Sequence, residues 1–172
     1  MKYVVDVPKN YLRMILIVLS VIALTVLGYF KSPRGEDGRT MFLSPRMAQI
    51  SKYQQNSMGW VENLREIQAG LEQLLSNRST ELLEQDALVN RYSGRLRNLQ
   101  AELDGTSAPP TLEALHSSLV ETVAAYIEAS SWIASWISEP SQANYLSAQE
   151  ALDKASSLLA RLDQNPWVRS EP

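Results

Sequence analysis

The sequence predicts an all-α protein in which a single N-terminal transmembrane helix precedes an antiparallel four-helix bundle. Three observations lead to this prediction. Met14–Phe30 is a run of seventeen residues without a charge. Apolar residues then recur at helical spacing in four segments of similar length. Breaks rich in Pro, Gly and polar residues separate most of these segments, which is typical of a bundle with short loops.

The transmembrane anchor is predicted at residues 12–30, after an N-terminal tail of residues 1–11. At about 1.5 Å per residue, the uncharged run is roughly 26 Å long, which is close to the ~30 Å hydrocarbon core of a bilayer. The side-chain stems of Arg13 and Lys31 can extend it. Because no A-x-A-like cleavage site follows the run, we expect it to be retained as a single-pass signal-anchor. The lipid bilayer is therefore the first partner that the sequence predicts.

The charges along the chain bear on its orientation and on its partners. Three Lys or Arg residues precede the uncharged run and three lie in residues 31–43 directly after it, so the positive-inside rule does not decide between the two orientations. A short tail before an uncleaved anchor favours a cytoplasmic N-terminus, with the helical domain outside. Residues 41–172 have a net charge of −6, from ten basic and sixteen acidic residues. This acidity argues against nucleic acid as a partner, since phosphate binding needs a positive surface.

A flexible hinge at 31–43 and a C-terminal tail at 165–172 bound the helical domain, residues 44–164. The hinge contains three residues that interrupt helices: Pro33, Gly35 and Gly38. Ser44-Pro45 then provides a capping side chain followed by proline at the first helical position. The tail begins where Asn165-Pro166 stops the last helix.

The first two bundle helices are predicted at residues 45–75 and 80–103. Their apolar stripes contain Val61, Leu64, Leu71 and Leu75 in the first helix, and Leu82, Val89, Leu96 and Leu103 in the second. The heptad phase continues through the polar residues 76–79, so the alternative is one long coiled-coil helix over 45–103, followed by a helical hairpin. We favour a hairpin of two helices, because Arg78 would fall in the apolar stripe of the long helix.

The last two helices are predicted at residues 112–138 and 142–162, on either side of Glu139-Pro140-Ser141. The third helix is the most apolar of the four and has two adjacent stripes. The first stripe consists of Leu112, Leu115, Leu119, Thr122, Tyr126, Ala129, Ile133 and Trp136. Such a wide apolar face is typical of a helix that packs against at least two neighbours.

Residues with catalytic or metal-binding chemistry do not form a recognisable motif in this sequence. Glu113 and His116 have the Glu-x-x-His spacing of di-iron sites in helical bundles, but those sites need the motif twice and this chain has one His. We find no Gly-rich phosphate loop and no nucleophile–base arrangement. The sequence therefore predicts no catalytic, metal-binding or cofactor-binding residues and no enzyme activity.

Four residues are candidate contacts for a protein partner: Trp132, Trp167, Glu121 and Glu128. The two glutamates belong to an acidic strip on the third helix, which carries no Lys or Arg. Trp is favoured at interface hot spots; Trp132 lies at the edge of the apolar face and Trp167 on the C-terminal tail. The simpler interpretation is that each Trp covers its own core. The strip would then form ion pairs with the second helix, which carries Arg91, Arg95 and Arg97.

Together these features predict a single-pass membrane protein whose helical bundle is a non-catalytic binding, scaffolding or accessory subunit near the membrane. We expect a protein partner or self-association. The alternative is a membrane-tethered, sensor-like domain, since helical bundles can bind small molecules between their helices. That alternative needs a signalling partner, because only residues 1–11 precede the anchor.

Overall fold

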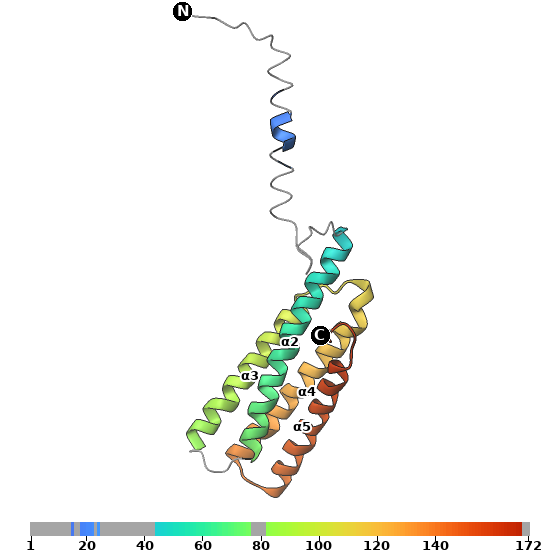
Figure 1. Cartoon of the computed structure of the whole chain (residues 1–172). Coiled ribbons are helices and arrows are strands. Elements are labelled where there is room, and N and C mark those ends of the chain that lie inside the picture. Colours follow the sequence, from blue (N-terminus) through green and yellow to red (C-terminus); the bar gives the residue numbers. More distant parts are fainter. Residues whose placement is uncertain (1–14, 16–17, 23, 25–43, 77–81, 170–172) are drawn as a thin grey trace, which may run out of the picture. The chain divides into compact units, whose positions relative to one another are not determined.

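The computed structural model describes residues 15, 18–22, 24, 44–76 and 82–169. The chain divides into two compact units, Met1–Pro45 and Arg46–Pro172. The bundle helices of the second unit are α2 (Pro45–Ser76), α3 (Leu82–Asp104), η1 (Pro110–Leu112), α4 (Glu113–Ser138) and α5 (Gln142–Asp163). Figure 1 shows the four long helices side by side, and the described residues contain no strand. The prediction of an all-α helical bundle is confirmed.

The described part of the first unit is a short helical stretch at residues 15, 18–22 and 24. Its large apolar side chains are exposed: Ile15, Val18, Leu19, Val21, Ile22 and Leu24. Within the described residues, no helix combines the length and hydropathy that crossing a membrane requires. The predicted tail at 1–11, the hinge at 31–43 and most of the anchor at 12–30 lie outside the described residues.

Helices α2 and α3 form an antiparallel hairpin. Arg95 Nη2 donates to Asn63 Oδ1 at 2.5 Å and to Glu66 Oε2 at 2.7 Å, and the ring of Tyr92 lies against Gly70. In one continuous helix, Glu66 and Arg95 would be about 43 Å apart along the axis. The alternative of a single coiled-coil helix over residues 45–103 is therefore wrong.

Helix α4 packs against both α3 and α5, as its wide apolar face predicts. The hydroxyl of Ser93 on α3 donates to Ser130 Oγ on α4 at 3.1 Å. On the other side, Lys154 Nζ of α5 donates to Glu128 Oε2 at 3.0 Å. Every residue of the predicted first stripe is buried, from Leu112 at its start to Trp136 at its end. This stripe forms the centre of the core.

The bundle closes through contacts of α2 with α5 and α4. Arg65 Nη2 of α2 donates to Asp163 Oδ1 at 2.7 Å, and Tyr53 of α2 is hydrogen-bonded to His116 of α4. Because α2 contacts α3 and α5, and α4 contacts the same two helices, the four helices enclose one core.

Two details of the predicted packing are wrong. The heptad pattern predicts Leu82 in the apolar stripe of the second helix, but Leu82 is 65% exposed, because α3 begins at this residue and its first turn lies at the end of the core. The charge pattern predicts that the acidic strip of the third helix pairs with the arginines of the second helix. Arg95 instead pairs with Glu66 of α2, and Glu128 pairs with Lys154 of α5, because the helical register turns these charges toward those neighbours.

Candidate functional site

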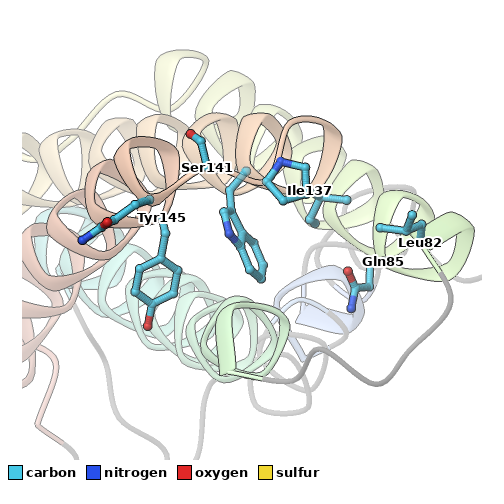
Figure 2. A pocket seen from close by; sticks show the side chains of 8 residues that line it. Leu82, Gln85, Ile137, Ser141 and Tyr145 are labelled. Atoms are coloured by element: carbon cyan, nitrogen blue, oxygen red, sulfur yellow. The ribbon is translucent and has the colours of Figure 1, made fainter.

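A cavity of about 500 Å³ opens at the end of the bundle where α3 begins and α4 turns into α5. Its walls come from three segments, and Figure 2 shows their side chains around the opening: Leu82, Gln85, Trp136, Ile137, Pro140, Ser141, Gln142 and Tyr145. The opposite end of the bundle, where α2 begins and α3 ends, does not contribute to it. The cavity is therefore a feature of one end of the bundle.

The turn between α4 and α5 holds the floor of this cavity in place. Pro140 interrupts the helix, since it has no amide hydrogen to continue the ladder. Ser141 then caps α5, its Oγ accepting from the backbone N–H of Asn144 at 3.1 Å. The side-chain amide of Asn144 donates back to the carbonyl of Glu139 at 2.9 Å. These bonds fix the first turn of α5, which carries Gln142 and Tyr145 into the cavity wall.

Two aromatic rings, those of Trp136 and Tyr145, are part of the cavity wall. The ring centroids of Trp136 and Tyr145 are 5.8 Å apart, with an edge-to-face interplanar angle of 60°. Trp136 and Ile137 are buried, and Gln85 is a buried polar residue at the same wall. Large rigid rings with a few polar groups are typical of binding pockets, because they offer contact area at a low entropic cost.

Exposed apolar side chains surround this end of the bundle. Leu82 at the cavity mouth is 65% exposed, and its neighbour Leu83 is 82% exposed. Leu146, one helical turn after Gln142, and Trp132, one turn before Trp136, are exposed as well. Single exposed apolar residues are common, but a group beside an open cavity marks a surface suited to an apolar partner.

The opposite end of the bundle holds a more polar groove of about 710 Å³. Lys52 and Tyr53 of α2 line it together with the loop at 105–110. Tyr53 Oη lies 2.7 Å from His116 Nδ1, and the ring of Tyr53 packs edge-on against Trp60. Burial raises the pKa of Tyr53 to about 12, so this phenol keeps its proton at neutral pH. The Tyr53–His116 pair thus has the character of a structural hydrogen bond between α2 and α4.

The structure does not bring the four predicted contact residues together. Trp167 follows α5, whose C-terminal residues lie beside Ser118 of α4. Trp132 lies further along α4, about 21 Å from the level of Ser118. Both Trp residues are exposed, Trp132 at 39% and Trp167 at 40%. They therefore belong to opposite ends of the bundle and cannot form one compact site.

The two predicted acidic contacts lie along α4 between these tryptophans. Glu121 is exposed and lines a small cavity of about 120 Å³ together with Arg161. Glu128 is exposed but already paired with Lys154. In the ranges 44–76 and 82–169 and the few described residues before them, no three His, Cys, Asp or Glu side chains are placed to hold a metal ion.

Sequence reasoning misses most residues of the cavity. The apolar pattern places Trp136 in the stripe of the third helix and Leu82 in that of the second, and it treats Pro140 and Ser141 as a helix break. The adjacent pair Leu82-Leu83 does not mark the cavity by itself, since Trp136 and Ile137 are also adjacent and both are buried. No family model, curated protein or solved structure matches this chain, so its function is argued from the bundle and its cavity.

Proposed function

We propose that this protein is a membrane-anchored, non-catalytic binding module whose helical bundle engages a protein partner through the cavity at residues 82–85 and 136–145. The single observation that carries this proposal is the open aromatic cavity with exposed leucines at its mouth. Burying such a surface against a partner releases roughly 25 cal/mol per Å² of apolar area. Aromatic residues in a concave site are also the common anchors of interface energy.

The proposed membrane attachment is supported by the sequence at residues 12–30. Met14–Phe30 has no charge, and the apolar side chains described between Ile15 and Leu24 lie on a helix and are exposed. The proposed orientation has the N-terminus in the cytoplasm and the bundle outside. Protease treatment of sealed vesicles tests it: the bundle is cleaved from outside only in this orientation, and its protection would reverse the assignment.

Site-directed photocrosslinking in intact membranes tests the binding role. A photoreactive residue at Gln142, exposed at the cavity, is compared with one at Ser157, exposed further along the same helix. We expect an adduct of one defined mass from Gln142, none from Ser157, and loss of that adduct when Leu82→Asp is added. Equal adducts from both positions, or products containing only this chain, would contradict a separate protein partner.

A second candidate function is the binding of a small apolar ligand that a partner then senses. The volume of the cavity favours it, since about 500 Å³ lies within the ~300–1,000 Å³ range of ligand pockets. The test is the melting temperature of the full chain with a panel of small aromatic compounds. A rise that Gln142→Trp abolishes would favour this function, and no rise for any compound would leave the protein-binding proposal.

A further inference from the structure

The charge of the bundle is strongly uneven about the cavity. In the half that contains it, residues 70–76, 82–92 and 130–153, the described chain has six carboxylates and one cation, Arg91. The carboxylates are Glu72, Glu84, Asp86, Glu139, Glu150 and Asp153. The other half, residues 44–69, 93–129 and 154–169, has eight of each sign. In the sequence between α2 and α3, Arg78 and Glu81 cancel.

The ion pairs of the bundle increase the difference in charge between its two halves. The four ion pairs found among the described residues all lie in the balanced half, on Arg65, Arg95 and Lys154. None of the six carboxylates of the cavity half takes part in them. Glu84 and Glu139 are exposed beside cavity residues, the first next to Gln85 and the second next to Pro140. The cavity is thus bordered by exposed apolar residues and lies in a negatively charged half of the bundle, whose six carboxylates form none of the four ion pairs of the described residues.

An acidic cluster alone binds nothing in particular, but here it adjoins a concave apolar surface. A complementary partner must bring apolar side chains for the cavity and cations for its edge. An amphipathic helix with Lys and Arg beside its apolar face has both, and the docking of such a helix into a groove is a recurrent mode of recognition. Electrostatic complementarity at the edge would speed association and fix orientation, while the apolar contacts slow dissociation.

We propose that the occupant of the cavity is a basic amphipathic helix of a partner protein, with its apolar side chains against Trp136 and Tyr145 and its Lys or Arg residues facing Glu84 and Glu139. This inference rests on the proposed function, because it names the partner chemistry of the same cavity. It excludes an acidic or uncharged partner segment at this site.

The test uses the full chain in nanodiscs of uncharged lipid and two synthetic peptides. Both peptides have the same length and the same leucine positions, and their polar faces carry only Lys in one and only Glu in the other. Binding is followed by fluorescence anisotropy, with empty nanodiscs as the blank for each peptide. We expect the Lys peptide to bind and the Glu peptide to bind at least about tenfold more weakly. We also expect added salt to weaken binding of the Lys peptide, because charges at the edge are screened.

Charge-matched variants distinguish an effect of the carboxylates near the cavity from an effect of the net negative charge of the bundle. The double substitution Glu84→Lys and Glu139→Lys should lower the affinity for the Lys peptide by about tenfold. Glu102→Lys with Asp104→Lys makes the same change in net charge at the other end of the bundle and should leave binding within about twofold. Leu82→Ser should lower the affinity for both peptides, because it removes apolar contact at the mouth of the cavity.

Each other outcome overturns the inference. If both charge-matched pairs lower the affinity for the Lys peptide equally, the peptide is attracted to the whole acidic bundle and not to the cavity. If the two peptides bind equally well, the charge of the partner does not matter at this site. If neither peptide binds while the Gln142 crosslink persists, the partner is not basic and the proposed function stands. If both the peptides and the crosslink fail, the proposed function fails too. Dimers of this chain that Leu82→Ser dissociates would mean that a second copy occupies the cavity.

Discussion

The ring of Tyr92 on α3 packs directly against Gly70 on α2. We predict that any side chain at position 70 disturbs this contact. A Cβ atom added at Gly70 would overlap the ring of Tyr92, so Gly70→Ala forces the ring or the helix to move. The two other glycines within the bundle helices are natural controls, because a Cβ at Gly59 or Gly94 meets nothing within 4 Å. The three substitutions are chemically identical and differ only in what lies beside the new methyl group.

The expected magnitudes follow from two opposing effects. In a helix interior, Ala is more favourable than Gly by about 0.5–1 kcal/mol, since it restricts the unfolded chain. Gly59→Ala and Gly94→Ala should therefore stabilise the protein by this amount. Forcing a side chain into an occupied site costs about 1–3 kcal/mol. Because Tyr92 is half-buried and its ring can swing partly outward, we expect Gly70→Ala to destabilise the protein by about 0.5–2 kcal/mol net.

Urea unfolding of the full chain in mild detergent, followed by far-UV circular dichroism, measures these changes at constant m value. The decisive variant is Gly70→Ala in a Tyr92→Ala background, where the ring is gone. There the substitution should become stabilising, like its two controls, with a coupling energy of about 1–3 kcal/mol. If Gly70→Ala alone stabilises as much as Gly59→Ala, then Tyr92 does not lie against Gly70, and the packing of α2 on α3 described above is refuted.

Four further predictions concern the core and the cavity. Tyr53→Phe should destabilise the protein by about 1 kcal/mol, because it removes the 2.7 Å bond to His116; an unchanged urea midpoint would contradict this. Tyr126→Phe should be neutral or stabilising, since the buried Tyr126 Oη has no hydrogen-bond partner in the described chain and an unpaired buried group costs about 1–3 kcal/mol. Burial raises the pKa of Tyr53 and of Tyr126 from 10.0 to about 12. The folded protein thus holds these protons at a pH where the unfolded chain has released them. Stability should be fully present below pH 10 and fall as the pH rises toward about 12, less steeply in each Phe variant; parallel profiles would refute the assignment. Leu82→Ser and Leu83→Ser should each change the free energy of unfolding by less than about 0.5 kcal/mol, because both side chains are exposed; a larger loss would mean that they belong to the core.

The sequence is a good guide wherever a local signal determines the structure. Pro45 begins α2 as its position after Ser44 predicts, and Glu139-Pro140-Ser141 separates α4 from α5. The apolar stripe of α4 is buried along its whole length, because a helix with a wide apolar face has one way to exclude it from water. The hairpin of α2 and α3 is harder to predict, since the heptad phase runs through the connection. Only contacts between distant residues, such as Arg95 with Glu66, decide it.

The cavity could not be predicted, because periodicity gives the face of a residue but not the point at which neighbouring helices end. Leu82 has the heptad phase of Val89 and Leu96, which are both fully buried, yet Leu82 is largely exposed. Tyr145 likewise lies on the buried side of α5 but faces an opening. The difference arises from the relative lengths and offsets of three helices, which no single segment encodes.

The two ends of the bundle are built differently, and this contrast supports the assignment of function to the cavity end. At the end where α2 begins, the groove of about 710 Å³ is more polar, Leu112 and Val168 are buried, and the Tyr53–His116 bond joins α2 and α4. At the other end, Leu82 and Leu83 remain exposed beside an open aromatic cavity. Fully burying one such leucine would contribute about 1.5–3 kcal/mol, so closing this end would stabilise the isolated bundle. Two exposed leucines beside a cavity, in the half of the bundle whose carboxylates outnumber its cations, are better explained by a partner that covers them than by folding alone.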